Sequence, residues 1–126
     1  MAYASYKELE SDVVRWAEAR RIVPNSTPVA QSRKTSEEAA ELIEAAAKIA
    51  LLDKLRHHLD EDVYVHERAD CLKEFEDAVG DVVVTLINAC ALADVQLEQC
   101  LLKAYSQIKN RKGTLLPNGI FQKEQA

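Results

Sequence analysis

Apolar positions in residues 3–20 recur every three or four residues, as they do on one face of an α-helix. The positions that define this face are Tyr6, Leu9, Val13 and Trp16. The stretch therefore predicts a first amphipathic helix. We expect its Trp16 side chain to be a core anchor rather than a platform on which a base stacks.

Three further helices are predicted from the same periodicity, at about 27–55, 67–92 and 95–110. The first of them begins where Thr27 can cap a helix and Pro28 can occupy its first turn. Long helices also agree with the composition, because three Gly and three Pro leave little material for the turns of a β-rich fold.

Two segments lack this periodicity. The polar stretch 56–66 predicts a loop. In the C-terminal tail, Pro117, Asn118 and Gly119 are typical turn residues and lie between apolar pairs. This pattern indicates a small hairpin or extended ribbon. No internal repeat is present, so residues 1–126 are expected to form one domain. The predicted fold class is an all-α bundle of four to five helices with a short extended or hairpin tail.

Charge and hydropathy exclude several classes of function. A formal net charge of −5 argues against non-specific nucleic-acid binding, which needs a basic surface. The chain has no run of about 20 apolar residues and no signal-peptide core near its start, so we expect a cytoplasmic protein without a membrane partner. The three widely spaced cysteines predict reduced thiols rather than a disulfide framework or a zinc site.

The predicted second helix carries four glutamates within eight residues: Glu37, Glu38, Glu41 and Glu44. At about 100° per residue, Glu38 and Glu41 share one face, while Glu37 and Glu44 point further toward solvent. Three other residues lie on the face of Glu38, namely Gln31, Lys34 and Ala45. The apolar residues expected to pack, on the adjoining side, are Ala39, Ile43, Ala46 and Ala50.

The predicted third helix carries a second polar stripe beside an apolar one. The polar residues are Glu74, Asp77, Asp81, Thr85 and Asn88, and their apolar neighbours are Phe75, Ala78, Val82 and Leu86. Carboxylates on two facing helices can converge inside a bundle, where a divalent cation would offset their repulsion and desolvation. Oxygen ligands suit Mg²⁺ or Mn²⁺. The competing interpretation is that all these carboxylates are simply solvated.

The segments "EEAAEL" (37–42) and "EFEDAVGDVVVTLINACA" (74–91) resemble the MazG-like, all-α nucleoside triphosphate pyrophosphohydrolases, whose signature is ExxE followed by ExxD on the next helix. The likeness continues through "WAEARRIVPNSTPVAQSRK", "LEQCLLKAYSQIKNRKG" and "GIFQKE". It covers nearly the whole chain and is greatest to short, stand-alone, phage-type members. ExxE alone is weak evidence, whereas the ordered set over about 100 residues is specific.

The resemblance implies an enzyme that uses two or more Mg²⁺ or Mn²⁺ ions per site. It would convert an NTP or dNTP to the monophosphate and pyrophosphate, with water attacking the α-phosphorus. Some phage-type relatives, the MazZ-type enzymes, act on GTP and dGTP, so a guanine-type purine substrate is expected. A dUTPase-like activity on pyrimidine nucleotides would use the same scaffold, and a non-catalytic helical interaction module is the alternative from another class.

Carried over onto this chain, Glu38 and Glu41 match ExxE, and Asp81 matches the aspartate that follows a small residue. Glu41 is the expected acceptor of the proton from the attacking water. Many members have a glutamate three residues before this aspartate, but here the position is Ala78. The second ligand pair is then either Asp77 with Asp81, or Glu74 with Asp77 and support from Asp81.

Basic and amide side chains are expected to bind the substrate. Lys34 lies one turn before Glu38, and Lys109 and Arg111 match the family's basic cluster at the end of the last helix. Gln31 and Asn88 lie on the two acidic stripes and can contact base, sugar or phosphate, although a hydrogen bond between helices is a competing role for Asn88. The resemblance also implies a homo-oligomer, either a dimer or a dimer of dimers.

Overall fold

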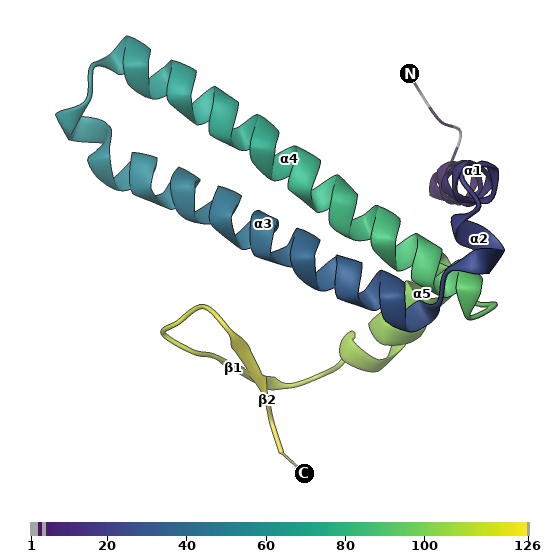
Figure 1. Cartoon of the computed structure of the whole chain (residues 1–126). Helices are drawn as coiled ribbons and strands as arrows, with labels where there is room; N and C mark the ends of the chain where they lie inside the picture. Colours follow the sequence, from purple (N-terminus) through teal and green to yellow (C-terminus); the bar gives the residue numbers. More distant parts are fainter. Residues whose placement is uncertain (1–2, 4, 126) are drawn as a thin grey trace.

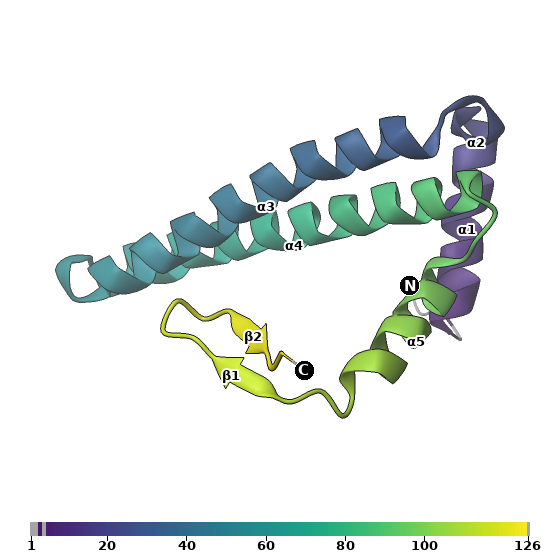
Figure 2. The same cartoon turned by 90° about the horizontal axis from the view of Figure 1, so that it is seen from below.

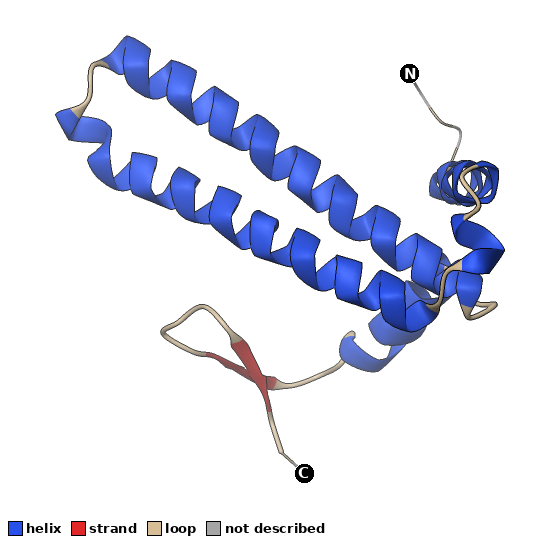
Figure 3. Cartoon of the chain, viewed as in Figure 1, coloured by secondary structure: helices blue, strands red, loops and turns tan. Residues whose placement is uncertain are grey.

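The computed structural model describes residue 3 and residues 5–125; residues 1, 2, 4 and 126 lie outside the description. The chain is mostly helical, which confirms the all-α prediction (Figures 1 and 3). In chain order the elements are α1 (Tyr6–Ala19), α2 (Ile22–Asn25), α3 (Pro28–Leu55), the 3₁₀ turn η1 (Arg56–His58), α4 (Glu61–Leu92), α5 (Leu97–Ile108), β1 (Gly113–Leu115) and β2 (Phe121–Lys123).

The two long helices begin at capping residues. The Thr27 hydroxyl accepts a hydrogen bond from the Ala30 amide at 3.0 Å, and Pro28 occupies the first position of α3, as predicted. At the start of α4 the Asp60 carboxylate accepts from the Asp62 amide at 3.0 Å. The prediction of a loop over 56–66 was therefore too long, because this cap and two acidic residues in the first turn start the helix at Glu61.

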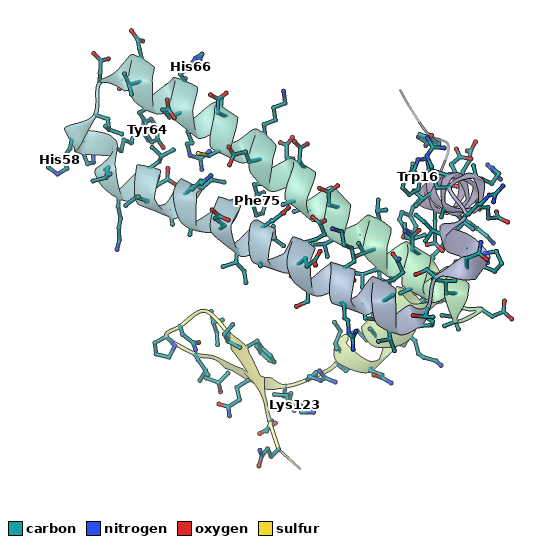
Figure 4. All side chains as sticks on the ribbon, viewed as in Figure 1. Trp16, His58, Tyr64, His66, Phe75 and Lys123 are labelled. Carbon is teal, nitrogen blue, oxygen red and sulfur yellow. The ribbon has the colours of Figure 1, made fainter. Side chains whose placement is uncertain are left out.

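α3 and α4 lie side by side and antiparallel over most of their length (Figures 1 and 2). The residues of α3 that are buried or half-buried along the seam are Gln31, Thr35, Glu38, Leu42, Ala45, Ile49 and Leu52. Those of α4 are Tyr64, Arg68, Cys71, Phe75, Ala78, Val82 and Thr85. Both sets alternate steps of three and four residues, which is the spacing of a coiled-coil seam. Tyr64 and Phe75 point between the helices, whereas His66 points away (Figure 4).

The packing face expected for α3 was wrong. Ile43 is 69% exposed, and Ala46 and Ala50 are exposed as well; Ala39 alone of the four predicted residues is half-buried. The stripe that contains Glu38 is the one that packs on α4. The reason is that α3 is rich in alanine and apolar on more than one side. Helical periodicity therefore defines its faces without showing which face the partner helix covers.

α1 crosses the C-terminal end of α4 (Figure 2). Its buried residues are Glu10 and Ala17, whereas Trp16 is 45% exposed, so the expectation of a core tryptophan was wrong. The Arg20 guanidinium instead lies 5.7 Å from the Trp16 ring centroid, in a cation–π contact at the surface.

The C-terminal tail forms the predicted hairpin. β1 and β2 are antiparallel, with Thr114 opposite Gln122. Gly119 has φ +86°, and the Asn118 side chain accepts a hydrogen bond from the Ile120 amide at 3.0 Å, so the Asn-Gly pair makes the turn. The hairpin extends from the end of α5 and lies to one side of the α3–α4 pair (Figure 2).

Within the described residues, no single helix combines the length and apolarity of a membrane span. α4 and α5 taken together meet both criteria, but the chain bends by 101° between them.

Candidate metal centre

Three carboxylates from two helices meet at the α3–α4 seam. Glu38 and Glu41 of α3 and Asp81 of α4 each have an oxygen, and these three oxygens all lie within 4.8 Å of one another. The ExxE spacing places its two glutamates on one side of α3, and the antiparallel packing places Asp81 beside them. A ligand set made only of carboxylate oxygens suits a hard divalent cation.

The members of this triad differ in burial. The Glu38 side chain is 12% exposed, and its Oε2 atom is buried without a hydrogen-bond partner among the described residues. A buried carboxylate oxygen without a partner carries a desolvation cost that a cation would offset. Glu41 and Asp81 are exposed and line an open cleft, so the triad has one buried member and two that solvent reaches.

The repulsion between these groups is visible in the pKa of Glu41. The negative charge of Glu38 is the main cause that raises this pKa above its ordinary value of 4.5, followed by hydrogen bonding between the two carboxyl groups. Some loss of hydration and the charge of Asp81 act in the same direction, whereas the positive charge of Lys34 opposes them. Three acidic groups held this close therefore form a strongly negative site.

The cleft beside the triad has a volume of about 350 Å³. Its lining residues are Glu41, Glu44, Ala45, Lys48, Glu74, Asp77, Ala78 and Asp81. Of the candidate ligands on α4, Asp81 belongs to the triad, whereas Asp77 and Glu74 line the cleft outside it. Asp77, which both predicted ligand schemes contain, therefore lies beside the triad and not in it.

The polar stripes continue from the triad toward the N-terminal end of α3 as contacts between helices. The Thr35 and Thr85 hydroxyl oxygens are 2.7 Å apart, and the Asn88 amide donates to the Gln31 side-chain oxygen at 3.4 Å. Asn88 is only 3% exposed, and its own Oδ1 atom is buried without a partner among the described residues. Gln31 and Asn88, predicted to bind substrate, are therefore hydrogen-bonded to each other in the seam.

The predicted phosphate-binding residues lie in two separate places. The Lys34 ammonium is 3.0 Å from a Glu37 oxygen and 3.6 Å from a Glu38 oxygen, next to the triad. Lys109 and Arg111 follow the last turn of α5, and they are absent from the lining of the carboxylate cleft within the described chain. The fold of one chain brings Lys34 to the triad and leaves the other two apart from it.

Two cleft residues were missed by the sequence analysis. Glu44 is exposed, as predicted, but it also lines the cleft, which was not predicted. Lys48 was not considered, and its ammonium lies 3.1 Å from a Glu74 oxygen across the cleft. The signal was available, because Lys48 follows Glu41 by seven residues, close to two helical turns, and so shares its face.

A larger cleft, of about 680 Å³, lies between α1, the end of α4 and the start of α5. Three acidic residues line it, Glu10, Glu18 and Asp94, and the Glu10 carboxylate already accepts hydrogen bonds from the amides of Leu97 and Glu98, at 3.1 and 3.0 Å. The convergence of Glu38, Glu41 and Asp81 beside the smaller cleft, rather than the volume of that cleft, makes it the candidate site.

No family model, no curated protein sequence and no solved structure matches this chain.

Proposed function

We propose that the chain is a Mg²⁺- or Mn²⁺-dependent nucleoside triphosphate pyrophosphohydrolase of the MazG-like type. The observation that carries the proposal is the convergence of Glu38, Glu41 and Asp81 on one point from two helices. These residues would hold the cation, with Asp77 and Glu74 available from the cleft wall. When bound, such cations neutralise phosphate charge and lower the pKa of a water molecule.

The reaction proposed is the conversion of an NTP or dNTP to its monophosphate and pyrophosphate, with a guanine nucleotide as the expected substrate. Glu41 is assigned as the acceptor of the water proton because it belongs to the triad and also lines the open cleft. Glu38 is the less suitable base, since its side chain is nearly buried in the seam. Lys34 would stabilise the phosphate charge beside the triad.

We also propose that the chain works as a homo-oligomer, with basic residues of one copy completing the site of another. In the described part of one chain, three of the five buried apolar residues are alanines, while Ile43 of α3 is 69% exposed and Leu101 of α5 is 66% exposed. Exposed apolar surface on this scale favours association. Lys109 and Arg111, which do not line the carboxylate cleft of their own chain within the described residues, would bind phosphate in the cleft of another copy.

The test is product analysis with each common NTP and dNTP, in the presence of Mg²⁺ or Mn²⁺. Wild type is expected to release monophosphate and pyrophosphate, and Glu41→Gln to lose activity by about 10²- to 10⁴-fold, the range contributed by a general base. Glu76→Gln is the matched control, because it removes the same charge from an exposed position of α4 outside the cleft lining. No turnover of any nucleotide with either metal would overturn the proposal. Fastest turnover of dUTP would replace the purine assignment by the pyrimidine one.

A further inference from the structure

Lys48 extends from α3 into the carboxylate cleft, although no part of the ExxE or ExxD motif includes it. Its ammonium is 3.1 Å from the Glu74 carboxylate of α4, so this ion pair joins the two helices beside the triad. Both side chains are about half exposed, at 49% and 54%. Solvent therefore screens the ion pair, and each of its two groups can exchange its present partner for another.

The Lys48–Glu74 ion pair lies in a cleft whose other charged groups, within the described chain, are all acidic. Five carboxylates line the cleft, those of Glu41, Glu44, Glu74, Asp77 and Asp81. Among the residues that the structure describes, Lys48 is the one basic side chain in the same lining. A lysine ammonium has three donors, and Glu74 accepts one of them. The Lys48 ammonium can therefore donate hydrogen bonds to a carboxylate and to a further anionic oxygen in the same cleft.

We propose that Lys48 is a substrate-binding residue that doubles as the resident counter-ion of Glu74. Without a divalent cation, its ammonium compensates Glu74. When a cation and a nucleotide occupy the cleft, Glu74 binds the cation and Lys48 binds an oxygen of the triphosphate. This inference rests on the proposed function, since it assigns a role at the same site.

Lys34 has a different setting and cannot take over this role. It pairs with two carboxylates, Glu37 and Glu38, on the other side of the triad. Fourteen residues of helix separate it from Lys48, which corresponds to about 21 Å along α3. The two lysines thus flank the carboxylates from opposite ends of the site.

The proposal predicts opposite effects on two ligands. In nucleotide-free protein, Lys48→Met is expected to tighten Mn²⁺ binding by about two- to fivefold, because it removes a competing cation of surface ion-pair strength. With Mn²⁺ saturating, the same variant is expected to bind the α,β-imido analogue of dGTP about tenfold more weakly, since it loses a charge-assisted hydrogen bond. Both affinities can be measured by isothermal titration calorimetry.

Two controls make the test specific. Lys54→Met removes the same charge from the exposed last turn of α3, outside the cleft lining, and is expected to leave both affinities unchanged. In a Glu74→Gln background, Lys48→Met should no longer tighten Mn²⁺ binding, because the pair is already broken. A general electrostatic effect of Lys48 would persist in that background and would contradict the proposal.

The outcomes separate this inference from the proposed function. If wild type binds Mn²⁺ and hydrolyses nucleotides but Lys48→Met behaves like Lys54→Met in both titrations, the role of Lys48 is wrong and the enzyme stands. If wild type binds no Mn²⁺, both proposals fall together. Opposite shifts in the two titrations, restricted to Lys48→Met, support both.

Discussion

The hydroxyl oxygens of Thr35 and Thr85 lie 2.7 Å apart across the α3–α4 seam. Thr35 is one turn before Glu38, and Thr85 is one turn after Asp81, so this contact fixes the register that sets the triad. Each hydroxyl also lies within hydrogen-bond distance of a carbonyl of its own helix, that of Gln31 or Val82. Since each hydroxyl has one proton, only one threonine at a time can donate across the seam.

Replacing Thr85 by valine should destabilise the helical hairpin. The substitution keeps the side-chain shape and removes a buried hydroxyl, for which we expect a loss of about 1 kcal/mol in the free energy of unfolding. Urea denaturation measures this quantity. Thr85→Ser keeps the hydroxyl and removes a methyl group, so it serves as the comparison. If serine proves as destabilising as valine, the interhelical hydrogen bond contributes little.

Glu10 is expected to hold α5 against α1. Its carboxylate accepts hydrogen bonds from the first two amides of α5, and it is 7% exposed. Partial loss of hydration, together with the neighbouring Glu10 carboxylate, raises the pKa of Tyr6 to about 12. Glu10→Ala removes this cap and should cost about 1–2 kcal/mol in the free energy of unfolding.

Amide hydrogen exchange localises the effect of Glu10→Ala. Protection should fall in α5 while α3 retains its own. Glu8→Ala, on the exposed side of α1, is the matched control. Equal loss of protection in α3 and α5 would instead indicate a global effect.

The carboxylate cluster should make stability depend on pH in a defined direction. Because the folded protein raises the pKa of Glu41, this residue favours the folded state below pH 4.5, and that contribution is lost as pH rises through the raised pKa. Metal-free Glu41→Gln should therefore unfold at a higher temperature than wild type at pH 7, and at a similar temperature near pH 4.

With Mn²⁺ present at pH 7, wild type should unfold at a higher temperature than Glu41→Gln. A cation that binds the folded triad stabilises wild type by mass action, whereas Glu41→Gln has lost a ligand and should gain little. Thermal unfolding with and without Mn²⁺ tests both signs in one experiment. A wild-type melting temperature insensitive to Mn²⁺ would argue that the carboxylates are only solvated.

The exposed side of α3 should determine the oligomeric state. Wild type is expected to be a dimer or a larger assembly by light scattering, because Ile43 is 69% exposed on an apolar face. Ile43→Arg should reduce the mass toward that of one chain, and Ile43→Leu should leave it unchanged. A monomeric wild type at all concentrations would contradict this prediction.

Much of this protein follows from local sequence. Thr27 and Pro28 predict the start of α3, and the Asn-Gly pair predicts the hairpin turn, because caps and turns depend on residues within one turn of each other. The spacing of Glu38 and Glu41 likewise places both on one side of a helix.

Only the tertiary structure decided how the two long helices meet. Periodicity defines the face of a helix but not its axial register against a neighbour, so the sequence left Glu74, Asp77 and Asp81 as competing ligands. The packing of α3 against α4 places Asp81 in the triad and pairs Glu74 with Lys48. The same packing buries the stripe of Glu38 and leaves Ile43 exposed. An alanine-rich helix has more than one side that can pack, so the contacts across the seam determine which side is buried.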